Sequence, residues 1–172
     1  MTLAQHSDST NYAPAIEKLK SAVRHDVAHK KLPAFWISLV DRDQVVWADG
    51  FGFQDAAQKR PATAETVYRV GSVSKLFTDI AVLQLVEKAR LDLDTDVRNY
   101  LPDFKPDNPF GVVLTLRQMM SHQSGLVRES PVGHYFDPDE PSLAVTVRSL
   151  NDTSLVYKPM TRTKYSNAVS NV

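Results

Sequence analysis

The sequence contains no cysteine among its 172 residues. A disulfide framework and a zinc site built from thiolates are therefore excluded. Long hydrophobic runs are also missing, since no stretch approaches the ~18 consecutive apolar residues of a membrane-spanning helix. Twenty basic and twenty acidic side chains give a net charge of zero. We therefore expect no nucleic-acid partner, no membrane span and no binding to an anionic membrane surface.

The N-terminal residues lack the apolar segment of a signal peptide. Residues 1–12 are mostly polar, and we expect a disordered lead there. The length suits one domain, and a hydrophobic content of 42% is enough to build a core. We predict a single domain over residues 1–172, with a helix and a sheet hairpin in residues 13–70 and a helical subdomain in residues 71–172.

Hydrophobic periodicity in the first third of the chain predicts one helix and a hairpin. A helix over residues 14–30 would bury apolar side chains that recur at helical spacing. β-branched and aromatic residues predict strands over residues 35–40 and 45–48, joined by a turn. We expect the glycines in residues 49–52 to end or bend the second strand, with a glycine at a bulge. A polar loop is expected over residues 54–64.

Two patterns resemble metal sites, but we interpret them otherwise. His25 and His29 are four residues apart, yet no third ligand is evident, and we interpret them as part of a solvated helix face. Alternating aspartates in residues 92–96 resemble a calcium loop, but Val97 stands at the position where the tight turn requires glycine. We therefore expect turns and helix caps there, and no metal or other cofactor.

A serine three residues before a lysine, Ser72 and Lys75, stands where an apolar run begins. The run predicts a buried helix over residues 74–86, preceded by a short β-like segment at residues 66–70. Residues three apart share a helix face, so Lys75 Nζ can reach Ser72 Oγ. A weak nucleophile beside a group that can take its proton suits acyl transfer. The backbone N–H at the helix start can bind an oxyanion.

The pair also has an ordinary interpretation, an N-cap serine with a surface lysine. Other polar residues also have both a catalytic and a structural interpretation at this point. Tyr165 could act in the same site or could be a packed aromatic residue at a helix entry. His122 follows a helix that Thr115 is expected to cap, and it could serve as a base for Ser124 or Ser72, or satisfy carbonyl groups at the helix end. We expect Gly125 to cap the C-terminus of that helix.

Several motifs in a fixed order resemble the serine β-lactamase and penicillin-binding superfamily, in particular its class C-like branch. The motifs are Gly71-Ser72-Val73-Ser74-Lys75, His122-Gln123-Ser124-Gly125-Leu126 and Tyr165-Ser166-Asn167. The tyrosine motif favours this branch over class A, which has serine-aspartate-asparagine there. The branch also holds D-alanyl-D-alanine carboxypeptidases and esterases. The resemblance covers the chain from about residue 15 to residue 172.

The resemblance implies an α+β, β-lactamase-like fold, in which an antiparallel sheet with flanking helices adjoins a helical subdomain. It implies Ser72 as the nucleophile, Lys75 as its proton partner and Tyr165 as a second general acid or base. Asn167 would orient a substrate amide, since a carboxamide offers both a donor and an acceptor. The implied function is a serine hydrolase that forms an acyl-enzyme with a β-lactam, a D-amino-acid peptide or a small ester. The alternative is a non-turnover ligand-binding or sensor module on the same scaffold.

The sequence departs from the family at two places. Pro159-Met160 stands where the family usually has Pro-Gly, so the loop must differ if glycine's freedom is needed. The family's third motif lies on a strand beyond the tyrosine motif, whereas the sequence ends at Val172. We therefore expect an N-terminal portion with an incomplete sheet and little activity by itself. The apolar helix over residues 74–86 then has too few partners, and we expect part of its apolar surface to stay exposed. The resemblance also implies a small-molecule substrate and a periplasmic or secreted location, and the oligomeric state is left open.

Overall fold

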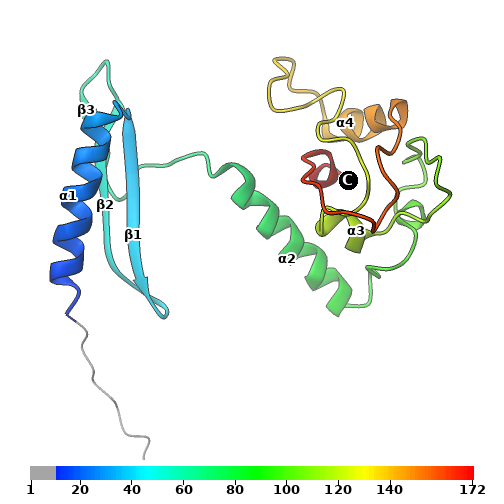
Figure 1. Ribbon diagram of the computed structural model, residues 1–172, viewed down its shortest axis with the longest axis horizontal. Coiled ribbons are helices and arrows are strands. Elements are labelled where there is room, and N and C mark those ends of the chain that lie inside the picture. The colour runs from blue at the N-terminus through cyan, green and yellow to red at the C-terminus, as the bar shows by residue number, and fades with distance from the viewer. Residues whose placement is uncertain (1–10) are drawn as a thin grey trace, which may run out of the picture. The chain divides into compact units, whose positions relative to one another are not determined.

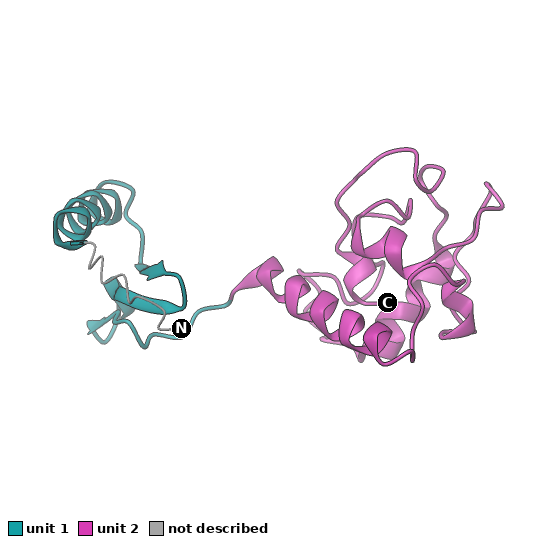
Figure 2. Ribbon diagram, turned by 90° about the horizontal axis from the view of Figure 1, so that it is seen from below, with its two compact units in different colours: residues 1–69 teal, residues 70–172 magenta. Residues whose placement is uncertain are grey.

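The computed structural model describes residues 11–172, and the chain divides into two compact units (Figure 2). Residues up to Arg69 form unit 1, and residues from Val70 onward form unit 2. This division falls within one residue of the predicted border between the sheet region (residues 13–70) and the helical subdomain (residues 71–172). That both parts belong to a single domain remains a prediction. Residues 1–10 of the predicted disordered lead lie outside the described residues.

Unit 1 consists of one helix and a three-stranded antiparallel sheet (Figure 1). Its elements in chain order are α1 (Ala13–His29), β1 (Ala34–Asp41), β2 (Gln44–Asp55) and β3 (Arg60–Pro61). The sheet has the strand order β1-β2-β3. Cations of α1 lie over aromatic rings of β2, with Lys20 Nζ 5.9 Å from the ring centre of Trp47 and the Arg24 guanidinium 5.9 Å from that of Phe51. The predicted helix and hairpin are thus confirmed.

Two details predicted for unit 1 are wrong. The glycines were expected to end or bend the second strand, and the end is wrong, because the strand continues to Asp55. The expected glycine bulge is also wrong, since the irregularity in the β1–β2 pairing lies between Leu39 and Val40. Gly50 is needed inside β2 because a Cβ there would lie only 2.4 Å from the backbone nitrogen of Thr63. The predicted polar loop contains β3, which adds a third strand to the sheet. A strand of two residues is too short for an alternating hydrophobic pattern to reveal it.

Unit 2 holds helices that are joined by irregular segments (Figure 1). Its α-helices are α2 (Ser74–Glu87), α3 (Leu116–Met120) and α4 (Leu143–Ser149), and its 3₁₀ turns are η1 (Gly71–Val73), η2 (Val97–Asn99), η3 (Leu150–Asp152) and η4 (Ala168–Ser170). The core of the unit is a cluster of apolar side chains, namely Val97, Phe104, Leu114, Met119, Leu126, Leu150, Leu155 and Ala168. Burying a large apolar side chain contributes about 1.5–3 kcal/mol. The cluster therefore holds α3, α4 and the C-terminal segment together.

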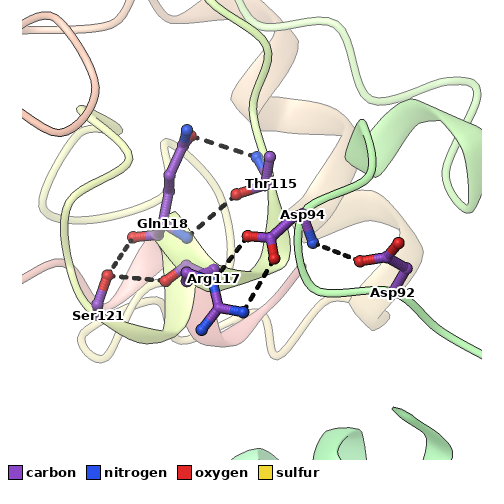
Figure 3. Close-up of polar contacts among 6 residues, drawn as sticks. All are labelled: Asp92, Asp94, Thr115, Arg117, Gln118 and Ser121. Atoms are coloured by element: carbon purple, nitrogen blue, oxygen red, sulfur yellow. Dashed lines mark hydrogen bonds and ion pairs between the residues drawn. The ribbon is translucent and has the colours of Figure 1, made fainter.

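Polar side chains define the start of α3 (Figure 3). Thr115 Oγ1 accepts the N–H of Gln118, and the Gln118 side chain accepts the N–H of Thr115, which is a complete capping box. The Asp94 carboxylate accepts two hydrogen bonds from Arg117, at 2.7 and 2.9 Å, while the Asp94 N–H donates to Asp92. The predicted turn and helix cap are present, since Asp92 accepts within a turn and Asp96 caps η2, whereas the ion pair with Arg117 was not predicted. Over residues 11–172, no three His, Asp or Glu side chains gather as metal ligands.

α2 is rich in apolar residues, yet none of its residues is buried. The helix that the apolar run marks as buried is therefore uncovered here, as expected where too few partners are present for it. Only the face that carries Lys75, Asp79 and Val82 is half-buried. Its large exposed apolar side chains, with their exposed fractions, are Leu76 (58%), Phe77 (66%), Ile80 (44%), Leu83 (44%) and Leu85 (37%). Within residues 11–172, no helix is long and apolar enough to cross a membrane.

Three local predictions, for the segment that leads into unit 2 and for unit 2 itself, also need correction. The segment at residues 66–70 is not a strand, and Val70 has helical dihedral angles of −85° and −2° that lead directly into η1. α3 ends at Met120, and the left-handed residue that follows it is His122, with φ 57°, rather than Gly125. Met160 has φ 64°, so a methionine adopts the conformation for which glycine is suited.

Candidate active site

Ser72 lies in η1, immediately before α2. Gly71 precedes it with φ +54°, a conformation that side-chain-bearing residues rarely adopt, and this lets the chain turn into the helix. The serine is exposed and borders a hollow of about 300 Å³, whose lining also includes Lys75, Glu129 and Asn167. Backbone N–H groups in the first turn of a helix have no intrahelical acceptor. A small molecule in the hollow can therefore meet both the hydroxyl and an N–H donor.

Tyr165 contacts the Ser72 hydroxyl directly. Its O–H donates to Ser72 Oγ at 2.7 Å, between residues 93 positions apart in the sequence. The hydrogen bond with Ser72, together with the Lys75 ammonium and the Arg128 guanidinium, holds the pKa of the Tyr165 phenol below its ordinary value, although burial acts in the opposite direction. An ionised phenol in this position can accept the serine proton. The pair is thus arranged for proton transfer from serine to tyrosine.

Lys75 lies beside this pair but bonds to a different group. Its Nζ donates to Asn167 Oδ1 at 3.0 Å and lies 5.3 Å from the ring centre of Tyr165. We expected the amine to meet Ser72, since the two are three residues apart in the sequence. The structure differs because Asn167 offers the amine an acceptor, and because the serine hydroxyl is already hydrogen-bonded to Tyr165. Lys75 is therefore placed to act on the serine through the tyrosine.

Asn167 connects Lys75 to Glu129, a residue that sequence reasoning missed. Asn167 Nδ2 donates to Glu129 Oε1 at 2.7 Å, and the Asn167 backbone N–H donates to the carbonyl of Arg128 at 2.7 Å. The Arg128 guanidinium in turn lies 5.6 Å from the ring centre of Tyr165. Nothing in the local pattern around Glu129 indicates a site residue, because its partner is 38 residues further along the chain.

His122 packs against the tyrosine ring. The centres of the two rings are 4.5 Å apart, with an angle of 39° between their planes, and His122 Nδ1 accepts the backbone N–H of Ser166 at 3.4 Å. Burial lowers the pKa of His122, and the Lys75 ammonium lowers it further, with Asp79 opposing. A neutral imidazole therefore supports the ring of Tyr165 in the folded protein.

Ser124 is the other serine that the sequence raised as a nucleophile. Its side chain is only 1% exposed, and its Oγ accepts the N–H of Leu126 at 3.3 Å. A buried hydroxyl that is already engaged in a turn is inaccessible to a substrate from solution. The structure instead brings the four residues that the resemblance indicated into one cluster of unit 2, namely Ser72, Lys75, Tyr165 and Asn167.

The fold and this cluster define a class of protein, an α+β chain in which a serine at the start of a helix bonds to a tyrosine phenol. The family model described as Beta-lactamase matches residues 19–172 of the chain. The chain belongs to this family, as the order of its motifs predicted.

Sequence relatives agree with this membership. The chain is 28% identical over 152 residues to "Protein flp" of Staphylococcus aureus strain MRSA252, a match that covers 88% of this chain and 30% of that protein. It is 30% identical over 160 residues to "Beta-lactamase-like protein 2" of Dictyostelium discoideum, with 89% of this chain and 29% of that protein covered. The chain thus spans about 30% of the length of these curated relatives.

Solved structures confirm the β-lactamase-like fold. One described as "EstCE1, a hydrolase with promiscuous acyltransferase activity" superposes with a TM-score of 0.80 at 24% identity, covering 92% of this chain and 45% of its own. The octameric penicillin-binding protein homologue from Pyrococcus abyssi superposes with a TM-score of 0.73 at 29% identity, covering 91% of this chain and 37% of its own.

Proposed function

We propose that Ser72 is the nucleophile of a serine hydrolase that works through an acyl-enzyme. The observation that carries this proposal is the 2.7 Å hydrogen bond between Tyr165 Oη and Ser72 Oγ, at a phenol whose pKa is lowered. A weak nucleophile becomes reactive when a positioned base can take its proton. Membership of the Beta-lactamase family and the fold shared with a hydrolase support the same class of reaction.

The proposed reaction has two steps. Ser72 Oγ attacks the substrate carbonyl carbon while its proton passes to the Tyr165 phenolate, and the backbone N–H of Ser72 stabilises the oxyanion. The bond to the leaving group then breaks, and the proton moves from Tyr165 to that group. In the second step a water gives its proton to the phenolate and attacks the ester carbonyl. The bond to Ser72 Oγ then breaks, and the proton passes from Tyr165 to Ser72 Oγ, which releases the acid and restores both side chains. The Lys75 ammonium near the ring stabilises the phenolate at each stage.

The substrate classes we propose are β-lactams, D-amino-acid peptides and small esters. A hollow of about 300 Å³ beside Ser72 lies at the lower end of the range for small-molecule sites, which is about 300–1,000 Å³. Proteins of similar fold include a D-amino acid amidase from Ochrobactrum anthropi and the D-alanine carboxypeptidase AmpC from Burkholderia cenocepacia, at 19% and 24% identity. We also propose a periplasmic or secreted location, in keeping with the family resemblance.

Labelling with a fluorophosphonate, followed by peptide mass spectrometry, tests the nucleophile. We expect one adduct, on Ser72, that is lost in Ser72→Ala. Ser74→Ala is the matched control, because Ser74 is two residues away at the start of α2 and should label normally. An adduct on Ser124 or Ser74, or labelling of Ser72→Ala at the wild-type rate, would show that the nucleophile is misassigned.

Turnover is a question separate from acylation. The family's third motif supplies a second oxyanion donor, and residues 168–172 contain no such motif. Because removing one oxyanion donor costs about 10²–10³ in rate, we propose that these 172 residues are acylated but turn over poorly. Multiple turnover of nitrocefin or p-nitrophenyl acetate, lost in Ser72→Ala, would contradict this. A stable acyl-enzyme in a longer chain would favour the ligand-binding or sensor alternative.

A further inference from the structure

We propose that Glu129 is a positioning residue, whose carboxylate determines which way the Asn167 carboxamide faces. The consequence for catalysis rests on the proposed function, whereas the orientation itself does not. Glu129 lies in the segment that follows the histidine-containing motif, and its side chain is 39% exposed at the edge of the hollow beside Ser72.

The chemistry of the two neighbours leaves Asn167 one orientation. An ammonium has only donors, and a carboxylate has only acceptors. Asn167 Oδ1 accepts from Lys75 at 3.0 Å, and Asn167 Nδ2 donates to Glu129 at 2.7 Å. A flipped amide would set its NH₂ group against the ammonium and its oxygen against the carboxylate, so both contacts would become repulsive. Glu129 and Lys75 therefore select one of the two amide orientations.

The backbone places Glu129 for this contact. The segment around it runs beside the C-terminal segment through several hydrogen bonds. These join Ser166 Oγ to the Val127 carbonyl at 2.6 Å, the Asn167 N–H to the Arg128 carbonyl at 2.7 Å, and Asn171 Nδ2 to Ser130 Oγ at 3.0 Å. Both Ser166 and Ser130 are only 2% exposed. The carboxylate is thus held next to Asn167 by paired backbone segments on either side of the contact.

The oriented amide still has one N–H and one lone pair to offer. Each amide nitrogen carries two protons and each amide oxygen two lone pairs, and Glu129 and Lys75 use one of each. Asn167 itself lines the hollow beside Ser72. Other charged or titratable groups near this contact are Arg128, whose Nε lies 3.7 Å from Glu129 Oε1, and Tyr165, whose ring centre lies 5.3 Å from Lys75 Nζ. His134 and Tyr135 also line the hollow. The free N–H can therefore donate to a substrate amide carbonyl.

Glu129→Gln is the most informative substitution, because glutamine keeps the size of the side chain but has both a donor and an acceptor. We would measure single-turnover acylation of Ser72 by nitrocefin, whose side chain carries an amide apart from the reacting carbonyl, and by p-nitrophenyl acetate, an ester that has no such amide. Losing a hydrogen bond to a charged group justifies an expected slowing of about tenfold for nitrocefin, with the ester changed less than about threefold. The variant that combines Glu129→Gln with Asn167→Ala should be no slower than Asn167→Ala alone.

Glu140→Gln is the matched control, since Glu140 is an exposed acid about ten residues further along the same irregular segment. It removes the same charge, and both acylation rates should stay at the wild-type value. Equal slowing with nitrocefin and with the ester in Glu129→Gln, or additive losses with Asn167→Ala, would show that Glu129 does not act through Asn167.

A second measurement does not depend on reactivity. The side-chain NH₂ resonances of Asn167 are assigned by their loss in Asn167→Asp, and their hydrogen exchange with solvent is followed by NMR. We expect one of the two protons to exchange slowly in the wild type and in Glu140→Gln, and to exchange fast in Glu129→Ala. Unchanged exchange in Glu129→Ala overturns the inference. If exchange is slow and depends on Glu129, but no probe acylates the chain, the proposed function would be overturned and this inference would stand.

Discussion

Two regions of unit 2 are held in place very differently. Val97, Phe104 and Leu150 in the core are each at most 2% exposed, although much of the core is covered by irregular segments rather than by long helices. α2 is the longest helix of the unit, yet it has no buried residue, and Phe77 is 66% exposed. Regular secondary structure and burial therefore do not coincide here.

The active-site cluster draws on both regions. Ser72 and Lys75 come from η1 and α2, whereas Tyr165 and Asn167 belong to a segment tied to the core. The contacts between them are hydrogen bonds and a cation near a ring, at 2.7, 3.0 and 5.3 Å. The position of the nucleophile thus depends on a few polar contacts, while the position of the tyrosine depends on a packed core.

The largest effect should come from breaking these polar contacts. Lys75→Ala and Tyr165→Phe should each slow acylation of Ser72 by about 10²–10⁴, the usual contribution of a positioned acid or base. Because the two residues form one coupled proton system, the double variant should be little slower than the worse single variant. Rapid-quench mass spectrometry of the acyl-enzyme measures these rates.

The pH profile of the same reaction sharpens this prediction. In the wild type, acylation should rise with pH through the lowered pKa of Tyr165, below the ordinary tyrosine value of about 10. Lys75→Ala removes a cation that lowers the pKa of this phenol, so the rise should move to higher pH. Lys88→Ala, beyond the last turn of α2, should leave the profile unchanged. Additive losses, or an unshifted profile in Lys75→Ala, would argue against coupling.

Stability should separate the two regions. Leu150→Ala should lower the free energy of unfolding by about 2–5 kcal/mol, because it opens a cavity in a fully buried site. Phe77→Ala should change that free energy by no more than about 0.5 kcal/mol, as for other exposed positions. Urea denaturation followed by circular dichroism measures both values. A loss in Phe77→Ala as large as in Leu150→Ala would mean that α2 is buried in solution.

The same contrast predicts self-association. A helix with several neighbouring apolar side chains in contact with water is a surface for dye binding and for association between copies. Replacing Leu76, Phe77 and Ile80 together by glutamine should reduce both, as seen by fluorescence of a hydrophobic dye and by analytical ultracentrifugation. A monomeric wild type with no dye binding would contradict this expectation.

The smallest effect concerns the loop before the tyrosine motif. Met160 is left-handed, which costs roughly 1–2 kcal/mol for a residue with a side chain. Met160→Gly relieves this cost, and since glycine's extra chain entropy costs about 0.5–1 kcal/mol, we expect a net gain of about 0.5–1 kcal/mol in stability. Met160→Ala keeps the strain and is the control, since Met160 is 57% exposed. Equal stabilities for the glycine and alanine variants would show that the loop is unstrained.

Local signals in the sequence predicted the elements but not their burial. Apolar residues at helical spacing indicated α1, and Thr115 marked the start of α3 through its capping box. These features depend on residues within a few positions of one another. The apolar residues of α2 predict a helix that could be buried, but they do not determine whether other segments are present to cover it. The strand β3 has two residues and no periodicity to detect.

By itself, the sequence determined the family, the order of the motifs and the residue types that can carry acyl transfer. Ser72 and Lys75 share a helix face because of a three-residue spacing, and no tertiary contact is needed for that. Only the tertiary structure decided that Ser72 is hydrogen-bonded to Tyr165, that Lys75 donates to Asn167, and that Glu129 accepts from Asn167. The physical reason is competition between donors and acceptors in space. Each polar group bonds to the best partner that the packed core brings within reach, and those partners lie 38 to 93 residues away in the sequence.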